Sequence, residues 1–197
     1  MPRRAICATG GETAIPLNHD DVIDTAVELL RAHGLADLTM RRLARELDVQ
    51  PGALYWHVDN KQTLLVRVAE RMLADVGTAA GSTPLEGIRQ LAHDIRSTVL
   101  PVPDGSDVVA LGYALDPTSV PAFVRLRHLV GELCDSPATA AAMTDLIVHH
   151  VLGAVGVEQN RRAADLTTRG AAAAFEHGLD LALASIPATA ARRSSHG

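Results

Sequence analysis

Aromatic residues are scarce in this chain, at 3% of its 197 residues, although hydrophobic residues as a whole reach 47%. Alanine and leucine carry the apolar content, and this favours helices over the β-branched and aromatic patterns of a β-sandwich. A chain of this length has room for one medium domain, or for a small head on a larger body. The composition therefore predicts an all-α protein.

Long apolar runs, paired cysteines and an excess of positive charge are also missing. No apolar run reaches the roughly 18 residues of a membrane helix, and the polar first 11 residues lack the apolar core of a signal peptide. Cys7 and Cys134 are the only cysteines, so free thiols in a reducing cytoplasm are expected. The net charge of −5 argues against a surface coated in nucleic acid, but it leaves room for a local DNA-binding patch.

Helix start and stop signals divide the chain into four parts. We predict a flexible arm over residues 1–17, a three-helix head over 18–62, a helical body over 63–186 and a disordered tail over 187–197. Arg3 and Arg4 in the arm either touch DNA phosphates or are simply solvated. The head contains three short helix patterns, of which the last is opened by Pro51 at its first position.

Two late helices carry more apolar surface than a small body easily covers. The segment 143–157 is apolar nearly all round, and a helix of that kind is buried on all sides. A helix over 168–186 adds an apolar stripe of Phe175, Leu179, Ala182 and Ile186. We therefore expect a homodimer in which these two helices of each chain form a four-helix interface. The alternative is that both helices fill the core of a monomer.

The segment 38–58 has the form of a helix-turn-helix motif. Two short helices are joined by a few residues, and the second is too short to be stable alone. Its start, residues 50–53, is small and uncharged and can approach base edges in the major groove. Leu54 and Val58 share a face and are core candidates, so Tyr55 and His57 would point to the duplex as phosphate donors.

Each polar residue of the motif also has a simpler interpretation. Trp56 can be a packing residue, His57 a surface histidine, and Arg42 and Arg45 a solvated helix face. Arg41 has the stronger claim to a base, because a cation near a helix start is unfavourable and needs another reason. Residues 18–61 hold five basic against eight acidic side chains, a net charge of −3, so affinity must come from geometry and from two heads acting together.

At these residues the chain resembles the TetR family of one-component repressors. The runs LTMRRLAREL (38–47) and GALYWHVDNKQTLL (52–65) carry the resemblance, and LYWHV is similar to the tetracycline-repressor branch. The runs VLGAV (151–155) and FEHGLDL (175–181) resemble the last two dimer helices of that branch, so the resemblance covers residues 18–186.

The resemblance implies an all-α homodimer whose heads bind a palindromic double-stranded DNA operator. A small-molecule effector in the ligand-binding and dimerisation body would tilt the fourth helix and separate the heads. The resemblance places four residues at base-reading positions: Arg41, Gln50, Gly52 and Ala53. It places four others at phosphate-contacting positions: Tyr55, Trp56, His57 and Lys61. Pro51, between the base-reading residues, is counted with the DNA-binding set. Met40 replaces a small hydroxyl residue, so one phosphate contact is missing.

The resemblance departs from the tetracycline repressors at their metal chemistry. Those proteins hold a magnesium–tetracycline chelate with a histidine after the fifth helix and a carboxylate in the dimer helix. Val102 and Val157 stand at these positions here, and valine cannot ligate magnesium. We therefore expect no metal and an effector other than magnesium–tetracycline.

Polar residues among the apolar helices of the body are candidates for an effector pocket: His93, Tyr113, His128, Asp145 and His149. Asp145 and His149 share a helix face, as a hydrogen-bonded core pair or a metal pair. A few polar groups in an apolar cavity suit a largely apolar small molecule.

The sequence offers no sign of an enzyme. It has no glycine-rich phosphate loop, no nucleophile elbow and no paired Cys/His metal set, so no cofactor is expected. The remaining rival is a helical interaction protein that has lost DNA binding. The intact set of Tyr55, Trp56, His57 and Lys61 favours the regulator.

Overall fold

The computed structural model describes residues 17–77 and 83–186, which form nine α-helices and, within these ranges, no strand. The all-α fold expected from composition is confirmed. Residues 1–16, with Arg3, Arg4 and Cys7, and the tail from residue 187 lie outside the described residues. Within them, Cys134 is a free thiol.

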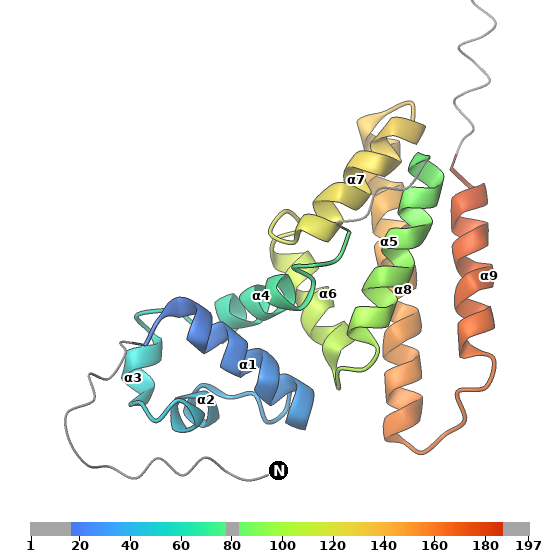
Figure 1. Cartoon of the computed structure of the whole chain (residues 1–197). Helices are drawn as coiled ribbons and strands as arrows, with labels where there is room; N and C mark the ends of the chain where they lie inside the picture. Colours follow the sequence, from blue (N-terminus) through green and yellow to red (C-terminus); the bar gives the residue numbers. More distant parts are fainter. Residues whose placement is uncertain (1–16, 78–82, 187–197) are drawn as a thin grey trace, which may run out of the picture.

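Helices α1 (His19–His33), α2 (Met40–Glu46) and α3 (Pro51–Leu54) form a head at one end of the molecule (Figure 1). Asn18 starts α1 with a capping box: its side chain accepts the Asp21 N–H (2.8 Å), and the Asp21 carboxylate accepts the Asn18 N–H (3.2 Å). Thr39 caps α2 by accepting the Arg42 N–H (3.1 Å).

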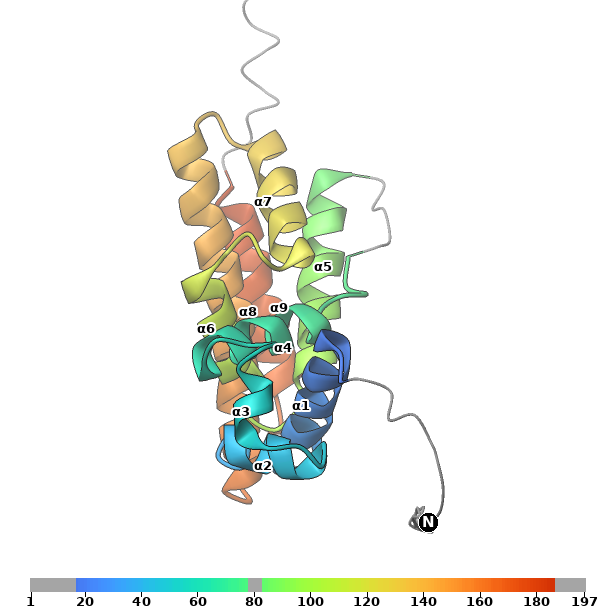
Figure 2. The same ribbon diagram turned by 90° about the vertical axis from the view of Figure 1, so that its left-hand side faces the viewer.

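Helix α4 (Lys61–Met72) belongs to the head and the body at once. It packs against α1 on one side and against α6 (Gly105–Leu115) on the other, which Figure 2 shows from the side of the head. A Cβ atom at Gly112 would stand 2.8 Å from that of Ala69, so α4 and α6 meet through two small residues. The expected domain boundary at residue 62 falls inside this shared helix.

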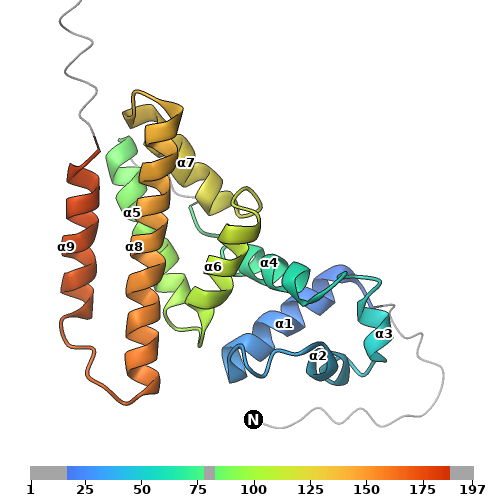
Figure 3. The same ribbon diagram turned by 180° about the vertical axis from the view of Figure 1, so that it is seen from behind.

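The rest of the body consists of α5 (Pro84–Val99), α7 (Pro121–Leu133), α8 (Pro137–Ala163) and α9 (Ala171–Ala184). Proline occupies the first position of α5, α7 and α8, where its missing N–H has no helical partner to lose. Helices α8 and α9 run side by side along the edge farthest from the head, and α8 lies between α9 and α6 (Figure 3).

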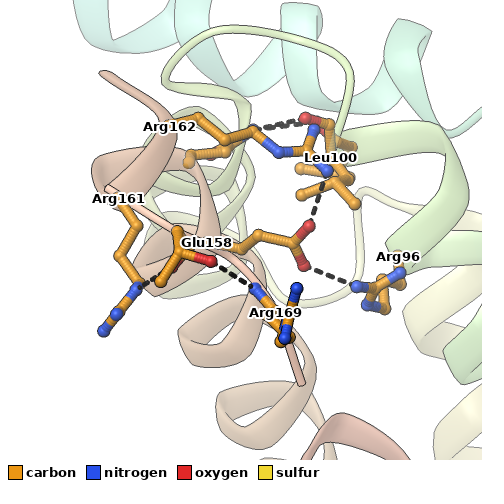
Figure 4. Close-up of polar contacts among 9 residues, drawn as sticks. Arg96, Leu100, Glu158, Arg161, Arg162 and Arg169 are labelled. Carbon is orange, nitrogen blue, oxygen red and sulfur yellow. Dashed lines mark hydrogen bonds and ion pairs between the residues drawn. The ribbon is translucent and has the colours of Figure 1, made fainter. Parts of the chain in front are cut away.

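Phe175 fixes α9 to its own chain. Its ring is 2% exposed, stacks on His150 (5.4 Å between centroids, 12° between planes) and receives the Arg96 guanidinium at 5.1 Å. The same arginine binds the buried Glu158 (2.6 Å), which also holds Arg162 (2.5 Å; Figure 4).

The apolar stripe of α9 therefore differs from expectation. Its members are buried inside one chain, and none is left for a partner: Phe175, Leu179, Ala182 and Ile186. What the two helices leave uncovered is another surface, marked by Leu146 (46% exposed), Val157 (61%) and Leu181 (60%). We call this surface the α8–α9 face. The expectation that α8 is buried on all sides is not met within a single chain.

In the part of the chain that the structure describes, α8 is the one helix long and apolar enough to cross a membrane, by length and composition alone. A core helix of a soluble protein passes the same test, so this is weak evidence for a span.

Candidate DNA-binding surface and effector cavity

The helix-turn-helix of α2 and α3 is built on a small, fully buried core. Leu43, Leu54 and Val58 are between 0% and 2% exposed, which confirms the core residues that the spacing predicted. Asp48 makes the turn between the two helices with a left-handed backbone (φ 55°). Because α3 is only four residues long, its direction is set by this packing and not by its own hydrogen bonds.

The opposite side of α3 presents rings to solvent. The Trp56 side chain is 90% exposed and Tyr55 is 53% exposed, so within this chain the packing interpretation of Trp56 is wrong. His57 is half-buried, and its carbonyl oxygen accepts a hydrogen bond from the His19 ring at Nδ1 (3.1 Å). Gln50, Pro51 and Gly52 are exposed and Ala53 is half-buried, so this edge of the motif is open to a partner.

The basic residues of the motif differ in how far they are engaged. Arg42 is tied to Asp37 through one guanidinium nitrogen (2.9 Å), while its Nε is buried with no hydrogen-bond partner among the described residues. Arg41 and Arg45 are exposed, and neither side chain has a hydrogen-bond or ion-pair partner among the described residues. Lys61 is half-buried at the start of α4, whose cap is Asn60. Arg41 and Lys61 thus lie on either side of α3 in the chain, and neither forms an ion pair with another described residue.

A cavity of about 750 Å³ opens between α6, α7 and α8. Tyr113, Asp145 and His149 all line it, so the structure brings three of the five candidate pocket residues together. The Tyr113 hydroxyl donates to Asp145 (2.5 Å), and the His149 ring meets the Tyr113 ring edge-on (6.5 Å between centroids). Burial, and then the hydrogen bond to Asp145, raise the pKa of Tyr113 to about 12.

Two other candidates lie away from the cavity. His93 contacts Glu176 (3.3 Å) and the Phe175 ring, between α5 and α9. His128 is exposed on α7 and faces Glu132 (3.2 Å). Val157 lines the cavity as a wall residue, but Val102 is buried in the core and does not line it, so Val102 says nothing about the effector.

The cavity is also more polar than the sequence predicted. Half of its lining residues are polar or charged, including four that were not foreseen: Ser106, Asp107, Arg127 and Asn160. The sequence alone could not assign these residues to a cavity. Each lies on a helix face, and the neighbour of that face is unknown without the fold.

Fold and surface together define a helix-turn-helix transcriptional regulator. The family model of the bacterial regulatory proteins, tetR family, matches residues 22–68. The Escherichia coli tetracycline repressor protein class E is 37% identical over 150 residues, which is 73% of this chain and 69% of the repressor. The chain therefore belongs to the TetR family, whose relatives found here are regulators and not enzymes.

Two solved structures extend the similarity over most of the chain. BioQ bound to its natural double-stranded DNA operator is 34% identical, with a TM-score of 0.75, over 87% of this chain and 99% of BioQ. A TetR variant of Acinetobacter baumannii AYE in complex with minocycline is 34% identical, with a TM-score of 0.73, over 85% of this chain and 95% of its own.

Proposed function

We propose that this protein is a ligand-responsive repressor that binds a palindromic operator as a homodimer and is released by a small-molecule effector. The observation that carries the proposal is the exposure of Trp56, at 90%, beside the uncharged start of α3. A large ring held outward in the turn that follows a well-packed helix fits a partner surface. An operator-bound relative with the same fold supports DNA as that partner.

The contacts follow from exposure and chemistry. The residues at the start of α3 would meet base edges together with Arg41: Gln50, Pro51 and Gly52, which are exposed, and Ala53, which is half-buried. Their small side chains let the helix come close, and a guanidinium binds guanine bidentately. Tyr55, Trp56, His57 and Lys61 would grip the sugar–phosphate edges. Since the head is acidic overall, one head alone binds weakly, and two heads about one duplex turn apart are needed.

The α8–α9 face is the surface on which we propose that the second chain packs. Leu146, Val157 and Leu181 are apolar and roughly half or more exposed, on two adjacent helices. Pairing this face with its symmetry copy would form a four-helix interface and bury them. Helices α8 and α9 lie on the side of the molecule away from the head (Figure 3), so pairing through them would leave both heads uncovered. A soluble dimer of this kind would work in the cytoplasm.

The cavity is where we place the effector. Its volume suits a drug-sized molecule, and its charged lining favours an effector with polar groups on an apolar body instead of a purely apolar one. Val157, on its wall, offers no oxygen to a magnesium chelate, so we propose an effector other than magnesium–tetracycline. The effector releases DNA by binding the spread form of the dimer more tightly, typically by about 1–3 kcal/mol.

Selection from a random duplex pool tests DNA binding directly. The wild-type protein should enrich an inverted repeat, and Arg41→Ala should weaken and broaden the recovered sequence. Lys61→Ala should weaken binding to all duplexes alike, because it contacts only phosphate. Recovery of no preferred sequence, or normal binding by both variants, would refute these assignments. Molecules that raise the melting temperature are then tested for release of the selected duplex.

A further inference from the structure

The loop between α5 and α6 is fastened to α8 by a single side chain. The amide nitrogen of Gln159 donates to three carbonyl oxygens at the end of α5 and in the loop, those of Val102 (2.6 Å), Val99 (3.0 Å) and Leu100 (3.4 Å). Its amide oxygen accepts from the Ser106 hydroxyl (2.9 Å) and backbone N–H (3.3 Å). Gln159 thus binds carbonyl groups at the end of one helix and the Ser106 N–H at the start of the next. The carbonyl groups of Val99 and Val102 also accept backbone N–H groups, at 3.0 and 2.9 Å.

The same loop reaches the head through Asp104. This residue occupies the N-cap of α6, yet its side chain makes no capping bond there. Its carboxylate instead accepts the backbone N–H of Leu35 (2.8 Å), in the turn that follows α1. The backbone of Asp104 is left-handed (φ 56°), an unfavourable conformation that this placement maintains.

Gly34 makes room for this contact. Its φ of 76° suits glycine, and a Cβ atom there would stand 2.7 Å from the Asp104 carboxylate oxygen. A carboxylate at the C-terminal end of α1 is unfavourable for the helix dipole. The arrangement therefore does not serve the stability of α1, and its effect is to join the head to the loop.

The cavity touches the turns that Gln159 joins. Ser106 on α6 and Gly156 and Asn160 on α8 all line it. At Gly156 the two helices are in contact, since a Cβ atom there would stand 3.0 Å from the Ser106 hydroxyl oxygen. A molecule that enters between α6 and α8 therefore contacts both of the elements that Gln159 joins. Asp104 lies in the same loop and contacts the head.

We propose that Gln159 and Asp104 are positioning residues that set the orientation of the head. Gln159 holds the α5–α6 loop against α8. Asp104 binds the turn after α1, so a movement of the loop also moves this turn. Breaking the Gln159 contacts frees the loop, and the head populates other orientations. This inference rests on the proposed function for its consequence on DNA, but the mechanical link itself can be measured without DNA or effector.

The first measurement is amide hydrogen exchange of Leu35 in the full chain, without ligand. Asp104→Ala removes the acceptor directly, and Gln159→Leu acts only through the loop. Both should speed exchange at Leu35 about fivefold or more, as loss of one hydrogen bond implies. The matched control is Gln90→Leu, since the Gln90 amide bonds only Asp94 (2.8 Å) on the surface of α5, and it should leave Leu35 unchanged.

Faster exchange in the loop of Gln159→Leu with wild-type exchange at Leu35 would overturn the link. If Gln159→Leu fails to fold, Ser106→Ala removes one arm of the contact and must show the same effect at smaller size, or the proposal is wrong.

The second measurement is affinity for the duplex selected by the wild-type protein. Gln159→Leu and Asp104→Ala should change it by about 5–150-fold, the usual range of coupling, without altering the preferred sequence. Wild-type affinity in both variants, together with faster exchange at Leu35, would overturn the positioning role. If the wild-type protein selects no duplex, DNA binding fails while the exchange result still decides the link.

Discussion

At the scale of single residues, exposure separates the side chains that build the head from those that meet a partner. Leu54 and Trp56 are two positions apart, yet one is fully buried and the other is 90% exposed. The alternation arises because α3 has one face on the core and ends within a turn. Substitution of Leu54 should therefore reduce stability, whereas substitution of Trp56 should reduce affinity for DNA.

We predict that Trp56→Ala leaves the free energy of unfolding within about 0.5 kcal/mol of the wild type, since the ring has almost no contacts to lose. Leu54→Ala, as the buried counterpart, should lower it by about 2–5 kcal/mol. Urea unfolding measures both, and affinity for the selected duplex should fall for Trp56→Ala although its fold is intact. Strong destabilisation by Trp56→Ala would show that the ring packs in solution.

A second prediction concerns the Tyr113 phenol. Its pKa is raised to about 12, so the folded state holds the proton more tightly than the unfolded chain, where the value is about 10. Its contribution to stability is therefore fully present below pH of about 10 and is lost as pH rises through about 12. Tyr55 and Tyr113 are the only tyrosines, so ultraviolet titration of Tyr55→Phe reports Tyr113 alone. Ionisation near pH 10 in the folded protein would contradict this.

Residue-level reasoning succeeded where a single helix decides the outcome. The core at Leu54 and Val58 follows from spacing within one segment. This reasoning could not tell that His93, His128 and Val102 lie away from the cavity, because whether a side chain lines a cavity depends on which helices cross. The sequence holds no local signal for those crossings, and Arg127 was missed for the same reason.

At the scale of helices, local chemistry fixed the starts better than the ends. Asn18, Thr39, Asn60, Thr83 and Ser136 cap helices in the structure because each offers a side-chain oxygen to a free N–H. The helix-turn-helix segment was predicted to extend to Val58, but its second helix, α3, ends at Leu54, because residues 55–58 form the turn into α4. The last helix begins at Ala171, not Thr168, since Gly170 takes a left-handed backbone (φ 83°).

Docking of α9 yields the prediction at this scale. Phe175→Ala should lower the free energy of unfolding by about 3–5 kcal/mol, because it removes a buried ring that contacts His150, His93 and Arg96. Phe175→Leu keeps most of the apolar volume and should cost less than about 1.5 kcal/mol. Chemical denaturation distinguishes the two. Equal losses would mean that the ring contacts, and not the buried volume, hold the helix.

At the scale of the whole molecule, the described residues leave large apolar side chains uncovered on two adjacent helices. The α8–α9 face carries Leu146, Val157 and Leu181, and helices α8 and α9 lie on the side of the molecule away from the head. The sequence predicted that both helices form the dimer interface. It could not show which apolar side of α9 is buried within the chain, because Phe175 and Leu181 are both large apolar residues and only the fold distinguishes their surroundings.

The prediction at this scale is the mass of the particle in solution. Sedimentation equilibrium should show a dimer for the wild type and a single chain for Leu146→Asp combined with Val157→Asp, because symmetric pairing would bring two pairs of buried carboxylates together. Leu115→Asp is the matched control, at an exposed leucine (53%) of α6 outside this face, and should remain dimeric. A monomeric wild type, or a dimer that survives both changes, would place the interface elsewhere.

The shared helix α4 has a bearing on how such regulators are recombined. A hybrid protein that joins the DNA-binding head of one relative to the effector-binding body of another has its junction near α4, which packs against both parts. Because Ala69 and Gly112 face each other with no spare room, a donor motif with a bulkier side chain at position 69 would push its new host apart. Compatibility between grafted halves should therefore be checked first at this contact and at the hydrogen bond between Leu35 and Asp104 (2.8 Å), before operator or effector specificity is considered.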